Sequence, residues 1–380
     1  MPHRILIAPD KFKGSLTALE AAEAMASGVR DAVPDACIDL CPIADGGEGF
    51  MEALQPALNG RWIETAAVDA RGRSMQSRYL LADTDSGPVA VIEMAATAGI
   101  ERLAENERDP LTATTRGVGL QLADAVRNHG VRRVFLGLGG SATNDGGCGL
   151  AAALGIRFLD ADGRELDPLP VNLPQVVRID DASRLELPPV TVACDVDNPL
   201  LGVRGATAVF SPQKGASPED QEVLETALAR LVEITGDHAS AETPGAGAAG
   251  GLGFGLLHFA KASLVPGFDL LADLLDFDQR IAAADLVLTG EGSLDVQSLG
   301  GKGPVALARR ARGIPVAGYC GIADDAVRNA GLFAHIGALA DTGRPFEELI
   351  RCAAALLREE VCRTPLLKLL ESPDSTPPHP

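Results

Sequence analysis

The chain has 380 residues, of which 46% are hydrophobic, and a formal net charge of −19 at pH 7. This length favours two domains over one. The acidic charge argues against nucleic acid as a partner, because that interaction needs clustered lysine and arginine. No apolar run reaches the roughly 20 residues of a membrane helix, and the first run is broken at Asp10, unlike a signal peptide. We therefore expect a cytoplasmic protein with no membrane partner.

The cysteines and histidines show no metal-binding pattern. The seven cysteines are odd in number and scattered, without CxxC spacing, and the six histidines show no HExxH or related spacing. We expect reduced, partly buried thiols and no zinc site.

Three segments along the chain read as a short buried strand, a polar or glycine loop and then a helix: 4–29, 131–155 and 284–311. Continuously apolar strands of this kind are typical of a parallel sheet covered by helices on both faces. IPVAGYCGI at 314–322 predicts one more such strand. The fold class is therefore α/β, with a doubly wound, Rossmann-like arrangement.

The middle of the chain has a different pattern. Residues 61–90 alternate apolar and polar positions between turn sequences, which predicts antiparallel strands, and a similar pattern returns in GIRFLDADGREL. We predict a discontinuous Rossmann-like domain (1–62 plus 281–370) with a mixed α/β domain (63–280) inserted in it. TPGAGAAGGLGFG is read as a loop at a site or a tightly packed helix start, with a flexible connector as the alternative. The Pro-rich tail, 371–380, is expected to be disordered.

The loop in VFLGLGGSATNDGG lies between an expected strand and an expected helix. Such a loop presents backbone N–H groups to an anion, which makes it a candidate phosphate cradle. It matches neither GxGxxG nor GxxxxGK[ST], and a sharp strand-to-helix turn is the alternative. Asn144 and Asp145 favour function, because a carboxylate beside a phosphate is costly unless a metal ion bridges the two.

Carboxylates recur after short apolar segments, in loops with glycine or small neighbours. In an open α/β sheet, ligands bind at the carboxyl ends of the strands, where these loops should lie. Each residue alone could instead cap a helix or lie in a solvated turn. The residues are Asp10, Asp45, Glu48, Asp195, Asp197, Glu291 and Asp295.

Basic residues in comparable loops are few, and ordinary surface lysines are the alternative interpretation. Next to glycine and small residues in so acidic a chain, they are candidate point charges for phosphate or carboxylate oxygens. They are Lys11, Lys13, Lys214 and Lys302. Carboxylates suited to magnesium, a glycine loop and lysines, without a nucleophile or redox signature, together indicate phosphoryl transfer.

Seven motifs carry a resemblance to a known family. In chain order they are IAPDKFKGSLTA, PIADGGEGF, GLGGSATNDGGCG, ACDVDNPLLG, VFSPQKGAS, GAGAAGGLGFG and LTGEGSLDVQSLGGKGP. They resemble the bacterial glycerate kinases of the glyoxylate and galactarate/glucarate routes, from about Arg4 to Leu357. The resemblance implies two α/β domains, one inserted in the other, and ATP- and Mg²⁺-dependent phosphorylation of D-glycerate to 2-phospho-D-glycerate.

Within this resemblance, residue roles are hypotheses. The loop residues Gly139, Gly140, Ser141, Thr143, Asn144, Asp145 and Gly146 are assigned to ATP phosphates. The lysines Lys11, Lys13, Lys214 and Lys302 are assigned to glycerate carboxylate and phosphate. Asp195, with Asp197 nearby, is the candidate general base, and the candidate magnesium ligands are Asp45, Glu48, Glu291 and Asp295.

The alternatives are a kinase for another hydroxy or sugar acid, phosphorylation of the 3-hydroxyl, a non-catalytic sensor, and a dinucleotide-dependent oxidoreductase. The missing GxGxxG spacing disfavours the oxidoreductase. The oligomeric state is left open.

Overall fold

The computed structural model describes residues 2–44, 47, 49–296, 298–300 and 303–371. Contacts divide the chain into two compact units, and the first draws on both ends of the sequence. Unit 1 consists of residues 1–45, 52–57 and 268–380, and unit 2 of residues 46–51 and 58–267. Of the expected tail, 371–380, the first residue is helical, because Glu371 ends a helix, and residues 372–380 lie outside the described residues.

Unit 1 is built on a parallel five-stranded sheet in the order β14-β13-β12-β1-β2. Numbered within the unit, this is the doubly wound order 2-1-3-4-5, so the predicted α/β class is confirmed. The strands are β1 (Arg4–Ile7), β2 (Cys37–Leu40), β12 (Leu286–Leu294), β13 (Val316–Ala323) and β14 (His335–Ala338).

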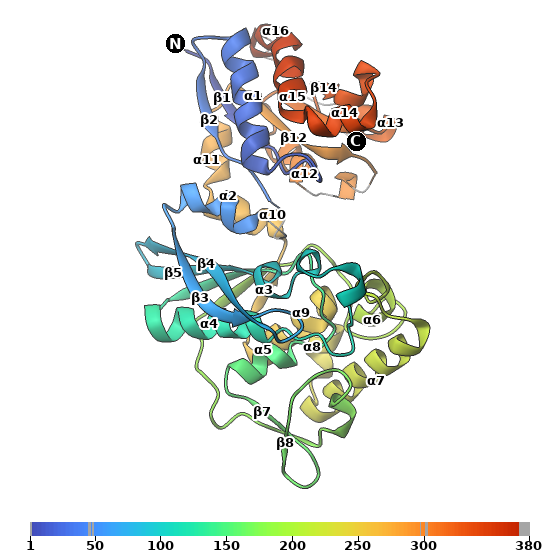
Figure 1. The fold of residues 1–380 in the computed structure, drawn as a ribbon. Helices are drawn as coiled ribbons and strands as arrows, with labels where there is room; N and C mark the ends of the chain where they lie inside the picture. Colours follow the sequence, from blue (N-terminus) through green and yellow to red (C-terminus); the bar gives the residue numbers. More distant parts are fainter. Residues whose placement is uncertain (1, 45–46, 48, 297, 301–302, 372–380) are drawn as a thin grey trace. The chain divides into compact units, whose positions relative to one another are not determined.

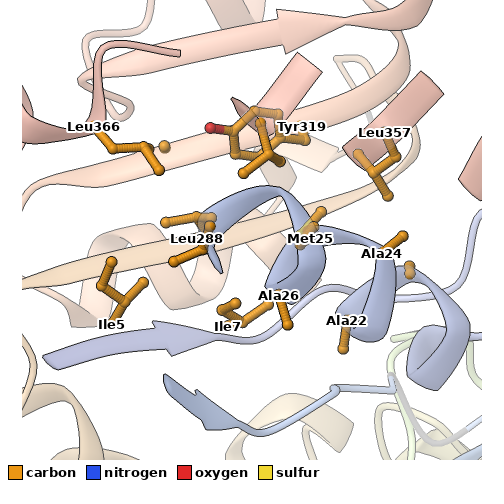
Figure 2. Close-up of a cluster of buried hydrophobic side chains, with 14 of the residues drawn as sticks. Ile5, Ile7, Ala22, Ala24, Met25, Ala26, Leu288, Tyr319, Leu357 and Leu366 are labelled. Atoms are coloured by element: carbon orange, nitrogen blue, oxygen red, sulfur yellow. The ribbon is translucent and has the colours of Figure 1, made fainter. Parts of the chain in front are cut away.

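Helices α1 (Ala18–Ala32) and α15 (Ala353–Arg363) pack together in unit 1, although they come from opposite ends of the chain (Figure 1). Thr17 and Glu20 form a capping box at the start of α1, which satisfies two of its unpaired N–H groups. The buried side chains of α1 then meet those of the strands and of α15 in one cluster (Figure 2). It includes Ile5, Ile7, Met25, Leu288, Tyr319 and Leu357.

Six further helices belong wholly or mainly to unit 1. They are α10 (Gly267–Leu274), whose first residue belongs to unit 2, α11 (Phe277–Ala282), α12 (Gly303–Arg310), α13 (Asp325–Arg328), α14 (Phe346–Arg351) and α16 (Leu366–Glu371).

Unit 2 has a mixed six-stranded sheet in the order β11-β10-β6-β5-β4-β3. The predicted antiparallel strands are confirmed as β3, β4 and β5, and from β5 onward the sheet is parallel. The strands are β3 (Arg61–Val68), β4 (Ser74–Thr84), β5 (Gly87–Glu93), β6 (Arg133–Gly137), β10 (Val190–Ala193) and β11 (Ser263–Val265).

A small antiparallel sheet, ordered β8-β7-β9, accounts for the second alternating segment of the sequence. Its strands are β7 (Arg157–Leu159), β8 (Glu165–Leu166) and β9 (Arg178–Asp180). The helices of unit 2 are α3 (Ala95–Ala98), α4 (Arg116–His129), α5 (Cys148–Ala153), α6 (Ala206–Phe210), α7 (Pro218–Thr235), α8 (His238–Glu242) and α9 (Ala248–Phe259). Helix α2 (Phe50–Ala57) belongs partly to each unit.

In the described part of the chain, no helix has the length and apolar character needed to cross a membrane.

Candidate active site

The chain reverses its direction of strand addition between β1 and β12 in unit 1. After β1 it adds β2 on one side, whereas β12 pairs with β1 on the other side and leads on to β13. The carboxyl ends of the two strands diverge at such a switch point, which leaves a crevice where open α/β sheets bind ligands. The loop after β1, the second half of β12 and the loop after β12 therefore form the first candidate site, which we call the β1–β12 cluster.

The β1–β12 cluster contains two predicted carboxylates that are both hydrogen-bonded to Ser298. Ser298 Oγ donates to Glu291 Oε1 at 2.9 Å, and the Ser298 N–H donates to Asp295 Oδ1 at 3.2 Å. Both carboxylates are partly accessible. Among the described residues, no group of three or more acidic, histidine or cysteine side chains is arranged to hold a metal ion. Two carboxylates nevertheless fit magnesium, which commonly takes one or two protein carboxylates and completes its shell with water and phosphate.

The lysines of the cluster lie on a short loop fixed by a buried aromatic ring. Phe12 is buried and its N–H donates to the Leu16 carbonyl at 2.9 Å. On either side, Lys11 is half-buried and Lys13 is exposed. The Asp10 N–H donates to the Gly290 carbonyl at 2.7 Å, which ties this loop to the middle of β12, next to Glu291. The structure thus brings Lys11 and Lys13 to the same edge of the sheet as the two carboxylates.

Three predicted site residues cannot be placed. Asp45 and Glu48 of the DGGEG motif and Lys302 of the GGKG motif lie outside the described residues.

The glycine loop of unit 2, residues 139–147, is the second candidate site. Only its first part is accessible: Gly140 is exposed, and Gly139 and Ser141 are intermediate. Thr143, Asn144, Asp145 and Gly146 are buried, so their side chains and amides face the protein interior. Accessible loop amides able to meet a phosphate are therefore confined to residues 139–141.

Asp145 is a loop-holding carboxylate inside unit 2, in place of the ligand-facing role expected from the sequence. Its side chain is fully buried. Oδ2 accepts hydrogen bonds from Thr115 N–H at 2.8 Å, Thr115 Oγ1 at 2.9 Å and Gly149 N–H at 3.1 Å, and Oδ1 accepts one from Gly147 N–H at 3.0 Å. Burial raises the pKa of Asp145, and these hydrogen bonds oppose the increase.

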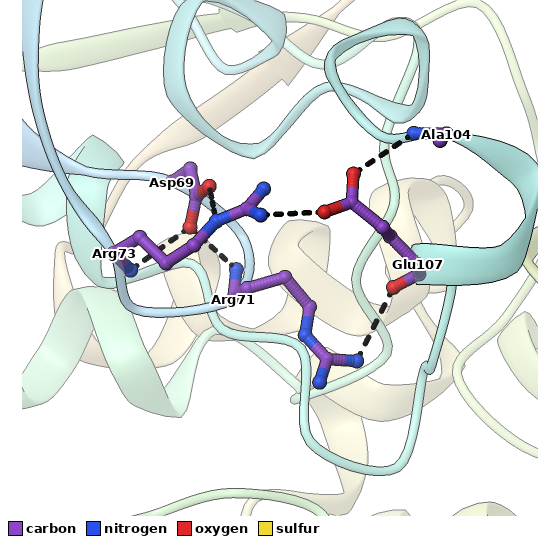
Figure 3. A network of polar contacts seen from close by, with 5 residues as sticks. All are labelled: Asp69, Arg71, Arg73, Ala104 and Glu107. Atoms are coloured by element: carbon purple, nitrogen blue, oxygen red, sulfur yellow. Dashed lines mark hydrogen bonds and ion pairs between the residues drawn. The ribbon is translucent and has the colours of Figure 1, made fainter.

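The segment that supplies Thr115 is itself fixed by a polar network (Figure 3). Arg73 Nη1 donates to Glu107 Oε1 and Arg73 Nε to Asp69 Oδ2, both at 2.6 Å. Arg71 Nη1 also donates to the Glu107 carbonyl at 3.2 Å. The turn between β3 and β4 is thereby tied to residues 104–109, which lead through the chain to Thr115. Several of these side chains are half-exposed, and exposed ion pairs add little to the free energy of unfolding. We therefore infer that the network mainly positions the segment 104–109.

Lys214 is also buried, with 1% of its surface exposed. Its Nζ donates to the Thr143 carbonyl at 2.7 Å. Burial lowers the pKa of Lys214 to about 7, and the charge of Asp145 opposes this decrease. The structure thus brings Lys214 to the inner side of the glycine loop.

The glycine-rich segment before residue 260 packs against the glycine loop through backbone. Ala249, Gly250 and Gly251 have φ angles of 52°, 68° and 85°, a left-handed turn inside α9. A Cβ on Gly250 would lie 1.9 Å from the Thr143 carbonyl oxygen, and the Gly146 N–H donates to the Gly250 carbonyl at 3.0 Å. These glycines serve close backbone packing, which agrees with the tightly packed helix start and not with a flexible connector.

Asp195 and Asp197 follow β10, which pairs in parallel with β6, and Ala193 is opposite Gly137. Both carboxylates are exposed and lie near the strand edge from which the glycine loop leaves. Asp195 Oδ1 accepts the Gly267 N–H at 2.8 Å, whereas Asp197 pairs with Arg204 at 2.9 Å.

Sequence reasoning missed Glu93, the last residue of β5. It is buried and its Oε1 accepts the Met51 N–H at 2.6 Å. In register it is opposite Gly137, at the start of the glycine loop. A Cβ on Gly139 would lie 2.4 Å from the Gly47 Cα, so Gly47 packs closely against the start of the glycine loop. The one feature of the sequence that could have indicated Glu93 is that a carboxylate ends the apolar run VAVIE.

Comparison with known proteins gives consistent matches over nearly the whole chain. The sequence model of the glycerate kinase family matches residues 5–366. Glycerate kinase of Bacillus subtilis (strain 168) is 44% identical over 327 residues, which cover 84% of this chain and 85% of that protein. Glycerate 2-kinase of Escherichia coli (strain K12) is 39% identical over 332 residues, covering 85% and 86%. A crystal structure described as glycerate kinase 2 from Salmonella typhimurium LT2 matches with a TM-score of 0.82 at 37% identity, covering 95% of this chain and 97% of that one.

Proposed function

The chain belongs to the glycerate kinase family, and from this premise we propose that it transfers the γ-phosphoryl group of ATP to the 2-hydroxyl of D-glycerate. The product would be 2-phospho-D-glycerate, and Mg²⁺ would assist. Support for the 2-hydroxyl comes from the relative named glycerate 2-kinase. The structural observation that supports the proposal is the β1–β12 cluster, where Lys11 and Lys13 follow β1 and two carboxylates bonded to Ser298 lie on and after β12, on either side of the switch point.

In the β1–β12 cluster, we assign Glu291 and Asp295 to magnesium and Lys11 and Lys13 to anionic oxygens of phosphate or glycerate. When bound, the ion neutralises charge on the transferring phosphoryl group. Ser298, through its hydroxyl and N–H, fixes the two carboxylates relative to one another. The assignments of Asp45 and Glu48 to magnesium, and of Lys302 to phosphate, remain predictions.

In the glycine loop, we assign the accessible amides of residues 139–141 to phosphate oxygens. We do not extend this assignment to Thr143, Asn144, Asp145 or Gly146, because these residues are buried. We likewise do not assign Lys214 to phosphate, because it is buried and its Nζ donates to the Thr143 carbonyl.

Asp195 is the proposed general base. The Gly267 N–H fixes one of its carboxylate oxygens while the residue remains exposed. In phosphoryl transfer, a carboxylate in this role accepts the proton of the attacking hydroxyl. Asp197 is the weaker choice, because its carboxylate pairs with Arg204.

The activity is tested with ATP, Mg²⁺ and D-glycerate, by coupling product formation through enolase with and without phosphoglycerate mutase. Enolase accepts 2-phosphoglycerate directly, so signal without the mutase supports the proposal. Signal only with the mutase would move transfer to the 3-hydroxyl. Absence of ADP formation would contradict glycerate as acceptor, and a panel of hydroxy acids would follow.

The base assignment is tested with Asp195→Asn, which we expect to lower kcat by roughly 10²-fold or more while ATP binding survives. Asp162→Asn, in an exposed turn, is the matched control for loss of one carboxylate. Near-normal turnover of the Asp195 variant would contradict the assignment.

A further inference from the structure

The side chain of Lys214 reaches a buried part of the glycine loop. Lys214 ends a short 3₁₀ turn, Pro212–Lys214, and its own N–H donates to the Ser211 carbonyl at 3.0 Å. This turn fixes the start of the side chain. The far end reaches the Thr143 carbonyl, 71 positions away in sequence.

The Thr143 carbonyl is enclosed on another side by backbone. Gly250 packs so closely that a Cβ there would overlap the carbonyl oxygen. The carbonyl therefore has little access to water, and the lysine is a donor that it can use. An unpaired buried carbonyl is destabilising, so loss of the lysine N–H should shift this part of the loop.

The surroundings of Lys214 are unsuited to contact with a bound phosphate. The residue is 1% exposed, and Thr143, which it contacts, and the neighbouring Asn144 are fully buried. The charge of Asp145 acts on it, and Asp145 is itself held by Thr115 and by the N–H groups of Gly147 and Gly149. Two buried charged residues thus hold the loop from within, at Thr143 and at Asp145.

We propose that Lys214 is a positioning residue for the glycine loop: it acts through the Thr143 carbonyl oxygen and sets where the accessible amides of residues 139–141 lie. The link to phosphate rests on the proposed function, whereas the link to loop position does not. This role requires an N–H donor and not a positive charge. Because burial lowers the pKa of Lys214 to about 7, the amine form is also populated near neutral pH, and it too can donate to the carbonyl.

Two replacements separate this role from direct phosphate contact. Lys214→Met keeps the length of the side chain without a donor, whereas Lys214→Gln keeps an N–H donor without a charge. Lys261→Met, at an exposed lysine of the same unit, is the control for loss of a positive charge. For each variant we would measure KM for ATP and kcat with D-glycerate from pH 6 to 9, and amide hydrogen exchange of the peptide covering residues 134–155.

We expect Lys214→Met to raise KM for ATP about tenfold or more, because a displaced loop presents its amides poorly. Its exchange in residues 134–155 should rise by about tenfold. For Lys214→Gln, KM for ATP and the exchange rate should both lie within about threefold of the wild-type values. The ratio of its KM to that of the wild type should not change from pH 6 to 9. Lys261→Met should match the wild type.

Equal loss of ATP affinity in the Met and Gln variants, with unchanged exchange, would overturn the proposal in favour of direct contact with phosphate. Normal KM and normal exchange in Lys214→Met would also overturn it. If the wild type does not phosphorylate glycerate, the proposed function fails separately. Hydrogen exchange of the Met and Gln variants then still decides whether Lys214 positions the loop.

Discussion

Replacing Asp145 by asparagine tests whether this carboxylate holds the glycine loop. Aspartate accepts four hydrogen bonds, three on Oδ2 and one on Oδ1. Asparagine can keep the three hydrogen bonds made to Oδ2 by placing its side-chain carbonyl oxygen at that position. Its amide group then faces the Gly147 N–H, so two donors oppose one another in a fully buried position.

The expected loss follows from these contacts. An unpaired buried N–H costs about 1–3 kcal/mol, and three hydrogen bonds lose their charge assistance. Removal of a buried charge offsets part of this cost. We therefore expect Asp145→Asn to lower the free energy of unfolding of unit 2 by about 2–4 kcal/mol.

The single tryptophan of the chain, Trp62, lies on β3 of unit 2, so its fluorescence during urea unfolding reports on that unit. With a slope of about 2 kcal/mol per M, the midpoint should fall by roughly 1–2 M. Asp162→Asn, whose carboxylate pairs with Arg164 on the surface, should stay within about 0.5 kcal/mol of the wild type. An Asp145→Asn midpoint equal to that of this control would refute the reasoning.

Two further predictions concern the same loop. Because the pKa of Lys214 falls from its ordinary 10.5 to about 7 on folding, the unfolded chain binds more protons between these values, and stability should rise with pH there. In urea unfolding, the free energy of unfolding of the wild type should rise relative to that of Lys214→Met between pH 7 and 10, by at most about 1.4 kcal/mol per pH unit. A difference between the two proteins that does not change with pH would contradict the lowered pKa of Lys214. Gly250→Ala should cost about 3 kcal/mol or more, because strain at φ 68° adds to overlap with Thr143. Gly163→Ala, at φ 78° with open space around it, should cost only about 1–2 kcal/mol, and equal losses at the two glycines would show that the close packing is unimportant.

Much of the fold was predictable because local patterns specify it. The apolar runs around Ile5, Leu136 and Leu288 are short and bounded by glycine or polar loops, and each became a parallel strand. The alternating segment after Arg61 became antiparallel strands for the same reason. The exact limits of the two domains were not readable, because the chain passes between units within segments that carry no distinct composition.

The site was less predictable, because a sequence does not show which way a loop residue faces. A carboxylate among glycines has the same local signature whether it meets a ligand or the protein interior. Asp145 is buried by Thr115, thirty positions earlier, and Lys214 is bound by Thr143, seventy-one positions earlier. Glu93 ends an apolar strand, and its hydrogen-bond donor, the Met51 N–H, is also distant in sequence. Such contacts become visible only once the chain is folded.

Unit 1 is formed by segments from both ends of the chain, so it cannot be completed until the C-terminal segment has been synthesised. β1 and β2 leave the ribosome early, but β12, the central partner of β1, is translated some 245 residues after β2. At a translation rate of roughly 5–20 residues per second, β1 and β2 lack this partner strand for on the order of 10–50 seconds. Nearly all of unit 2 is continuous in sequence and is complete before β12 emerges. The apolar strand around Ile5 therefore depends, during that interval, on chaperones or temporary contacts to escape aggregation.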